Sequence, residues 1–264
     1  MKIDFWKYEG TGNDFIIIDN RKGELKEKNA ALWKKLCNRR FGIGADGLML
    51  LQKPVAGKIK YDFEMYYVNA DGRPTSMCGN GGRCIAHFAK TLGIVKNHAR
   101  FMAIDGAHEA IIKGNTVKLK MNDVKKIDTA AGSYVLNTGS PHYITFVDDV
   151  MNTEVYARGK AIRNSNPYKK EGINVNFIQA AGDKSPVLRT YERGVENETL
   201  SCGTGTVAAA LTLAWLNKTG AKNYCLIKTM GGKLKVWYTR QAGGFTNVWL
   251  EGPATQVFKG KIKI

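Results

Sequence analysis

Short apolar runs separated by turns rich in glycine, asparagine and aspartate recur along the whole chain. Runs of this kind, roughly four to eight residues long, are typical of β-strands. Apolar positions at helical spacing predict helices at 29–38, 83–92 and 206–218, the last of which ends at Gly220. The strands are predicted at 15–19, 48–51, 62–68, 110–112 and 117–121, and again at 143–147, 175–178, 187–190, 225–229, 233–239 and 245–250.

The helix predicted at 206–218 is apolar on nearly every side over residues 207–216. Such a helix is stable when protein surrounds it, because no face of it favours water. A curved sheet wrapped around the helix provides that environment. The pattern therefore predicts an α+β fold, a mixed α/β roll in which a curved mixed β-sheet or barrel surrounds a central helix.

Two landmarks occur in the same order in each half of the chain. Thr11-Gly12 precedes a predicted strand in the first half, and Thr138-Gly139 precedes one in the second. Cys78-Gly79-Asn80-Gly81 opens a helix in the first half, and Cys202-Gly203-Thr204-Gly205 opens one in the second. The matched order, at nearly the same spacing, indicates an internal duplication.

The duplication predicts two similar lobes related by pseudo-twofold symmetry, with a ligand-binding cleft between their facing surfaces. The N-terminal lobe would span residues 1–124, joined by the C-terminal strand 252–264, and would carry Cys78. The C-terminal lobe would span residues 125–251 and would carry Cys202. We expect the connection between the lobes near residues 122–132.

Each of these two cysteines directly precedes a Gly-x-Gly at a predicted helix start. Free backbone N–H groups and the positive end of the helix dipole favour the thiolate there and can also hold a carboxylate. If both sulfurs flank one α-carbon, one thiolate removes its proton and the opposite thiol returns a proton to the other face. The pattern therefore predicts a cofactor-independent amino-acid epimerase with Cys78 and Cys202 as its two acid/base residues.

The cysteine count leaves a second use of the thiols open. Five cysteines without a regular spacing indicate free thiols in a reducing compartment rather than a disulfide framework. The spacing of Cys78 and Cys84 has no matching second pair, so no structural metal site is expected. A redox dithiol that cycles to a disulfide stays an alternative.

The net charge of +17 makes a nucleic-acid-binding module an alternative from another class. The basic residues are scattered, however, and no Lys/Arg cluster alternates with aromatic residues, so we expect no nucleic-acid partner. A field of this sign favours anionic small substrates. The chain has no apolar run of the roughly 20 residues that span a bilayer and no secretory signal at its start, so a cytoplasmic location without membrane contact is expected.

Several blocks, in order along nearly the whole chain, make the sequence similar to the diaminopimelate epimerase family. The resemblance implies a two-lobed fold, no pyridoxal phosphate, no metal and the interconversion of LL- and meso-diaminopimelate for lysine and peptidoglycan biosynthesis. A racemase or epimerase for another amino acid, such as histidine, is the alternative within this class. The blocks are 12–15, 41–47, 69–72, 77–84, 139–142, 174–177, 192–194 and 198–205.

The same resemblance implies roles for individual residues. Cys78 would be the proton donor and Cys202 the acceptor in the LL-to-meso direction. Arg193 offers a planar fork for a carboxylate, and Glu192 can accept from an ammonium group. His142 and Glu192 match positions that support activity. The residues implied to bind substrate are Asn13, Asn69, Gly79, Asn80, Asn174, Glu192, Arg193, Gly203 and Thr204.

The chain departs from the family pattern at two positions. Gly47 stands where some members have glutamine, and Ser140 stands where many have asparagine. Either change leaves the distal end of the substrate to a different set of contacts. The family also forms homodimers through C-terminal strands, which implies a homodimer here, with Val257 and Phe258 in the contact.

Overall fold

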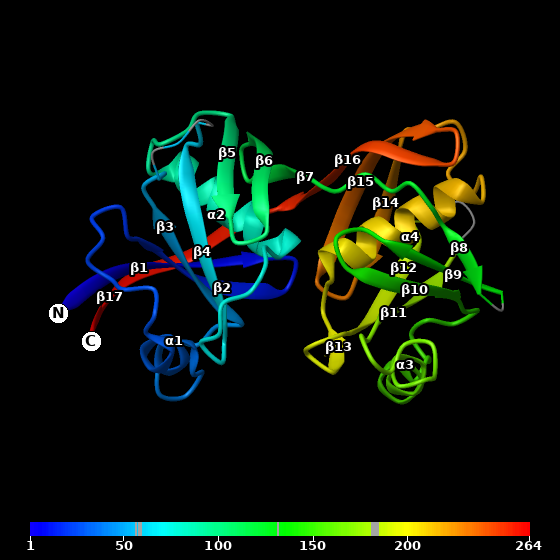
Figure 1. The fold of residues 1–264 in the computed structure, drawn as a ribbon, viewed down its shortest axis with the longest axis horizontal. Coiled ribbons are helices and arrows are strands. Elements are labelled where there is room, and N and C mark those ends of the chain that lie inside the picture. The colour runs from blue at the N-terminus through cyan, green and yellow to red at the C-terminus, as the bar shows by residue number, and fades with distance from the viewer. Residues whose placement is uncertain (56, 58–59, 131, 181–184) are drawn as a thin grey trace. The chain divides into compact units, whose positions relative to one another are not determined.

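The computed structural model describes residues 1–55, 57, 60–130, 132–180 and 185–264 (Figure 1). The chain divides into two compact units. Unit 1 comprises Met1–Leu119 and Gly252–Ile264, and unit 2 comprises Lys120–Glu251. Each unit combines a mixed sheet of parallel and antiparallel strands with two helices, so the predicted α+β class is confirmed.

In unit 1 two parallel strand pairs are embedded in an otherwise antiparallel sheet. Strands β17, β1 and β2 pair antiparallel, β2 and β3 pair parallel, β3 and β4 antiparallel, β4 and β5 parallel, and β5, β6 and β7 antiparallel. The elements are β1 (Lys2–Gly10), β2 (Asn13–Asp19), α1 (Ala30–Cys37), β3 (Gly47–Gln52), β4 (Phe63–Asn69), α2 (Gly79–Thr91), β5 (His98–Ala103), β6 (Gly106–Lys113), β7 (Thr116–Lys120) and β17 (Thr255–Lys263).

Unit 2 repeats this succession of pairings. Strands β8, β9 and β10 pair antiparallel, β10 and β11 parallel, β11 and β12 antiparallel, β12 and β14 parallel, and β14, β15 and β16 antiparallel, while β13 adds to β12. The elements are β8 (Asp128–Ala130), β9 (Ser133–Asn137), β10 (Pro141–Phe146), α3 (Val155–Arg163), β11 (Asn174–Gln179), β12 (Val187–Glu192), β13 (Asn197–Thr199), α4 (Gly203–Trp215), β14 (Tyr224–Thr229), β15 (Gly232–Gln241) and β16 (Gly244–Pro253).

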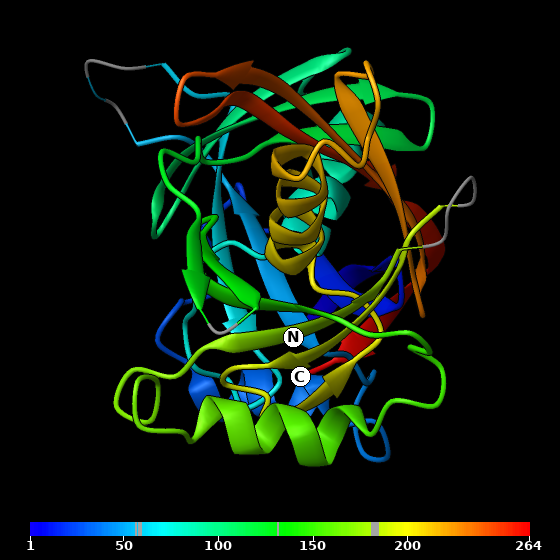
Figure 2. The ribbon, with the colours of Figure 1, turned by 90° about the vertical axis from the view of Figure 1, so that its right-hand side faces the viewer.

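The helices occupy equivalent places in the two units. Parallel neighbours require a crossover connection, and α1 and α3 provide the first crossover while α2 and α4 provide the second. Helices α2 and α4 are buried over most of their length. Figure 2 shows α4, in gold, on the concave side of the strands of unit 2, with α3 on the opposite side. A central helix in each unit therefore agrees with the prediction.

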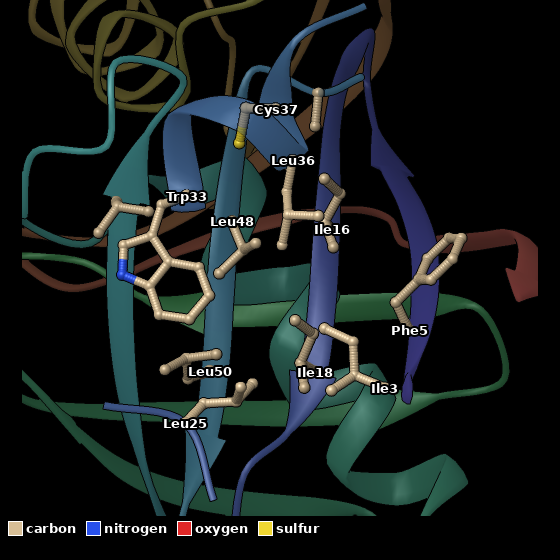
Figure 3. Close-up of a cluster of buried hydrophobic side chains, with 12 residues drawn as sticks. Ile3, Phe5, Ile16, Ile18, Leu25, Trp33, Leu36, Cys37, Leu48 and Leu50 are labelled. Atoms are coloured by element: carbon tan, nitrogen blue, oxygen red, sulfur yellow. The ribbon is translucent and has the colours of Figure 1, made fainter. Parts of the chain in front are cut away.

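Both faces of the central strands are covered, which explains their unbroken apolar runs. In unit 1, Ile16 and Ile18 of β2 pack in a core with Trp33 and Leu36 of α1 (Figure 3). Phe15 lies on the other face, where its ring would be 3.5 Å from a Cβ built on Gly81 of α2. Alternate residues of one strand thus contact α1 and α2.

Some elements carry too weak a local pattern to be predicted. Helix α3 was not predicted, because only Val155 and Gly159 of its nine residues are buried and the rest are exposed or only partly buried. Strands β1, β5 and β9 were also missed, although β1 and β5 alternate buried and more exposed residues over most of their length. The helix predicted from residue 83 begins earlier, at Gly79. Its start was predicted too late because the three glycines of its first turn have a low helix propensity.

Candidate active site

Cys78 and Cys202 occupy the same structural position in their units. Each is the N-cap of the central helix and has extended backbone angles, φ −90° and ψ 135° for Cys78 and φ −110° and ψ 114° for Cys202. Neither thiol forms a capping hydrogen bond to its own helix. Each cysteine therefore stands at the positive end of a helix dipole, as the sequence predicted.

The backbone of each cysteine is held by the helix that follows. The carbonyl oxygen of Cys78 accepts from Gly82 N at 2.7 Å, and that of Cys202 accepts from Thr206 N at 2.9 Å. Glycine is favoured at position 205, three residues after Cys202, because a Cβ there would lie 2.5 Å from Asn176 Oδ1. The Gly-x-Gly segment therefore lets side chains from the sheet approach the helix start closely.

The repeated threonines of the sequence contact these helix starts. Thr11 Oγ1 donates to Asn80 Oδ1 at 3.2 Å, and Thr138 Oγ1 donates to the carbonyl oxygen of Thr204 at 2.9 Å. Both threonines are buried. In each unit the turn before a parallel strand is thus tied to the second residue after the cysteine, which gives the matched landmarks a common structural role.

In unit 1 the structure brings Asn13 and Asn80 together. Asn80 Nδ2 donates to Asn13 Oδ1 at 2.5 Å, and Asn13 Nδ2 donates to Asp46 Oδ2 at 3.0 Å. Arg39 donates to Asp46 at 2.7 Å and also forms an ion pair with Asp14. Two of the predicted substrate residues therefore form one hydrogen-bonded group that ends on a carboxylate.

The carboxylate of Asp14 beside this group stays ionised at neutral pH. Burial of Asp14 works against ionisation, but hydrogen bonds and charges from Arg39 and Lys7 outweigh it and lower the pKa of Asp14 to about 2. Lys7 is itself buried and lies 2.7 Å from Asp14. The carboxylate of Asp14 and the cationic groups of Lys7 and Arg39 therefore place charges of both signs beside the group of Asn13 and Asn80.

Asn69 lies at the end of β4, opposite Gly47 in the antiparallel register. A Cβ on Gly47 would lie 2.6 Å from the ring of Tyr67 and 2.7 Å from the carbonyl oxygen of Val68. The departure at position 47 therefore has a structural reason, since the tyrosine ring fills the space that a larger residue would need. Asn69 itself is exposed.

In unit 2, Asn174, Arg193 and Ser140 lie together. Asn174 Nδ2 donates to Ser140 Oγ at 2.8 Å, and Asn174 Oδ1 accepts from the backbone N–H of Arg193 at 2.9 Å. Arg193 Nη2 donates to Ser140 Oγ at 3.4 Å. Glu192, the neighbour of Arg193, accepts from Thr199 Oγ1 at 2.9 Å. The second departure, Ser140, is thus part of the predicted group.

His142 is fully buried in unit 2 and uncharged. Its Nδ1 lies 3.1 Å from Asn176 Nδ2, which donates to it, so the ring proton is on Nε2. Burial, assisted by the positive charge of Arg193, lowers the pKa of His142 to about 3. Asn176 is oriented in turn by Thr190, whose Oγ1 donates to Asn176 Oδ1 at 3.0 Å. His142 therefore cannot gain a proton near neutral pH.

The other three thiols are protonated. All five cysteines are free, and Cys37, Cys84 and Cys225 are buried. Burial raises the pKa of Cys37 to about 12 and that of Cys225 to about 11, and it raises the pKa of Cys84 as well. These thiols are therefore unsuited to proton transfer at neutral pH.

Within residues 1–55, 57, 60–130, 132–180 and 185–264, no three His, Cys, Asp or Glu side chains lie where together they could ligate a metal ion. Within the same ranges, no helix is long and apolar enough to cross a membrane.

Sequence reasoning gave no role to Arg83, Asn176 and Thr190. Arg83 is buried in α2 and contacts Asn80, while Asn176 contacts His142 and accepts from Thr190. Arg83 and Asn176 lie within the family blocks at 77–84 and 174–177, so their motif context was the available signal. Their contacts depend on packing between strands and helices and could not be read from spacing.

The fold is shared with solved structures of low sequence identity. The chain is similar to a phenazine biosynthesis protein of the PhzF family from Bacillus anthracis, with a TM-score of 0.75 and 14% identity over 100% of both chains. It is also similar to a hydroxyproline epimerase from Agrobacterium vitis, with a TM-score of 0.67 and 14% identity over 99% of this chain and 92% of the other. These likenesses show that the chain shares its α+β fold with both proteins.

Sequence relatives identify the family. The diaminopimelate epimerase family model matches residues 5–127 and 134–257, one stretch for each half of the chain. The diaminopimelate epimerase of Flavobacterium psychrophilum is 47% identical over 99% of this chain and 100% of its own length. That of Chlorobaculum tepidum is 40% identical over 97% of this chain and 99% of its own. The chain belongs to the diaminopimelate epimerase family and is an isomerase.

Proposed function

We propose that this chain interconverts LL- and meso-2,6-diaminopimelate without a cofactor, in lysine and peptidoglycan biosynthesis. The observation that carries the proposal is the matched pair of cysteines, each the N-cap of a buried helix in one of two units with the same topology. Inversion of a stereocentre requires an acid and a base on opposite faces of one carbon. Two equivalent thiols, one from each repeat, are suited to that requirement.

In this mechanism Cys202 removes the α-proton of the LL isomer and Cys78 returns a proton to the opposite face. The backbone N–H groups at the two helix starts, at Gly79-Asn80 and Gly203-Thr204, donate to the carboxylate of the reacting centre. These donors are aligned before the reaction and stabilise the charge that develops when the proton leaves. The mechanism requires both sulfurs to reach the same α-carbon.

The other substrate contacts are proposed from chemistry that a diamino dicarboxylate requires. Arg193 would bind the distal carboxylate, and Glu192 would accept from the distal ammonium group. Neutral amides of Asn13, Asn69 and Asn174 would orient these groups without adding charge. His142 and Glu192 would support the cysteines; the neutral state of His142 suits it to a dipolar role.

A related amino acid is the second candidate substrate. The Tyr67 ring occupies the space beside Gly47, which pairs with Asn69, and Ser140 accepts from Asn174, so each departure from the family pattern lies next to a residue proposed to bind substrate. These differences concern recognition of the substrate. They leave the two cysteines and the reaction type unchanged.

Incubation with LL-diaminopimelate in deuterated water tests the proposed reaction. We expect meso-diaminopimelate to form and one deuterium to enter at the inverted α-carbon, as measured by chiral chromatography and mass spectrometry. L-Histidine under the same conditions serves as the rival substrate. Deuterium uptake into histidine without any into diaminopimelate would assign the chain to the second candidate.

We propose further that the protein is a cytoplasmic homodimer that pairs through β17. Val257 and Phe258 are 55% and 46% exposed, respectively, and the pairing described for β17 is with β1. Phe258→Asp should convert the dimer to a monomer, as measured by light scattering after size-exclusion chromatography. Ile111→Asp, at a residue of β6 that is 41% exposed, is the control and should leave the mass unchanged. An unchanged mass for Phe258→Asp would contradict this arrangement.

A further inference from the structure

Arg83 is a fully buried arginine in the helix that begins after Cys78. Within the described part of the chain it forms no ion pair, and its donors reach neutral oxygens instead. Nη1 donates to the carbonyl oxygen of Gly79 at 3.1 Å, and Nε donates to that of Pro253 at 3.3 Å. Nη2 donates to Thr11 Oγ1 and to Asn80 Oδ1, each at 3.0 Å.

This buried cation fixes the orientation of the Asn80 amide. Asn80 Oδ1 accepts from both Arg83 and Thr11, so the nitrogen of the amide must point the other way. It donates to Asn13 Oδ1, and Asn13 Nδ2 in turn donates to Asp46 Oδ2. The two amides therefore form a chain with one direction, from a guanidinium to a carboxylate.

The direction matters because an asparagine amide has two orientations that differ by a half-turn of the side chain. Reversing Asn80 would place its NH2 group against the donors of Arg83, and reversing Asn13 would place its oxygen against the carboxylate of Asp46. Reversal of Asn80 would bring donors together in a fully buried setting, where unpaired polar groups are costly, and reversal of Asn13 would bring two acceptor oxygens together in a partly exposed one. The charges at the two ends thus specify one arrangement of both amides.

The second unit provides an internal comparison. At the equivalent positions of α4, Val207 replaces Arg83 and Thr204 replaces Asn80. There, Thr138 donates to the backbone carbonyl of Thr204 rather than to a side-chain oxygen. A hydroxyl rotates freely and has no amide orientation to be fixed. The buried arginine therefore accompanies the amide and is absent where the amide is absent.

We propose that Arg83 is a positioning residue that fixes the amide of Asn80 and, through it, the amide of Asn13, so that Asn13 presents an N–H donor to the substrate. The inference rests on the proposed function, in which the Asn13 amide contacts an anionic amino acid. One N–H bond of Asn13 is used by Asp46, and the second is a donor for a carboxylate. A reversed Asn13 amide would present its oxygen and repel that group.

Substitution of Arg83 tests the positioning role. Arg83→Met keeps the unbranched stem but removes every donor, and we expect a KM for LL-diaminopimelate about tenfold higher with kcat within about threefold of wild type. Arg83→Lys keeps a charged donor and should recover much of the KM. Arg189→Met in unit 2 removes an arginine that pairs with Glu198 and donates to backbone carbonyls, and its KM should stay at the wild-type value. A folded Arg83→Met protein with wild-type KM would overturn the proposal.

Asn80→Asp provides an independent test that also works if Arg83→Met fails to fold. A carboxylate at this position would pair with the buried guanidinium but could no longer donate to Asn13. We therefore expect a melting temperature equal to or above that of wild type, together with a KM raised at least tenfold. A lower melting temperature would mean that the amide oxygen does not face Arg83, and it would refute the inference.

The proposed function and the positioning role of Arg83 would be refuted by different results. Wild-type protein that is inactive on diaminopimelate would refute the proposed function, whereas the melting temperature of Asn80→Asp tests the orientation of the amide without any substrate. Active wild-type protein with an Arg83→Met variant that binds equally well would refute the positioning role alone.

Discussion

Replacing either Cys78 or Cys202 by serine should lower kcat/KM for epimerisation of LL-diaminopimelate by at least about a thousandfold. A positioned acid or base contributes roughly 10²- to 10⁴-fold to a proton transfer, and a serine hydroxyl is far less acidic than a thiol. In a two-base mechanism each thiol is needed in every turnover, one as the base and one as the acid. The loss is measured as the rate of meso product formation, with folding checked by circular dichroism.

Cys225→Ser is the matched control for this prediction. Cys225 is buried in unit 2, and burial raises the pKa of its thiol to about 11, so it should take no part in proton transfer. The control should keep wild-type activity, and its stability should be modestly lower. A Cys78 or Cys202 variant that retains a tenth of the wild-type rate would contradict the two-base assignment.

The protein should lose stability as the pH falls from about 6.5 to about 3, and His142 should account for a large part of that loss. Burial, and secondarily Arg193, lowers the pKa of His142 in the folded state. Between those two pH values the unfolded chain binds a proton at this residue and the folded chain does not. Above the pKa of histidine in the unfolded chain, His142 therefore leaves the free energy of unfolding unchanged. At lower pH it decreases the free energy of unfolding by up to about 1.4 kcal/mol per pH unit.

Urea unfolding at several pH values measures this contribution. His142→Gln removes the titrating group, so the free energy of unfolding should depend less steeply on pH between about 6.5 and 3 than in wild type. Ile144→Val, at a buried residue of the same strand, should lower the free energy of unfolding by roughly 1 kcal/mol at every pH and leave the slope unchanged. Equal slopes in wild type and His142→Gln would show that the ring is not buried in its neutral form.

Elements with strong local signals were predicted well. The unbroken apolar runs of β2 and β3 mark strands covered on both faces, and the all-round apolar pattern of α4 marks a helix enclosed by protein. Helix α3 was missed because it covers one side of its sheet with few buried residues. These three elements and α3 thus differ in how strongly burial shapes their local sequence pattern.

The residues of the candidate site also differ in whether the sequence alone could predict them. The sequence predicts Cys78 and Cys202, their Gly-x-Gly segments and the paired threonines, because the duplication makes each structural position occur twice in one sequence. The partners of Asn13 could not be predicted, because Asn80 and Asp46 lie far from it along the chain. Family resemblance supplied Asn13 and Asn80 as binding residues without supplying the contact between them.

By itself the sequence determined the α+β class, the repeat and the helix-start position of the two cysteines, since each is encoded by order and spacing within short segments. Only the tertiary structure decided that His142 is neutral, that Tyr67 fills the space beside Gly47, and that Arg83 orients Asn80. Protonation, steric fit and the direction of a hydrogen bond depend on which distant groups packing brings within a few ångströms. These properties belong to the folded arrangement of the chain.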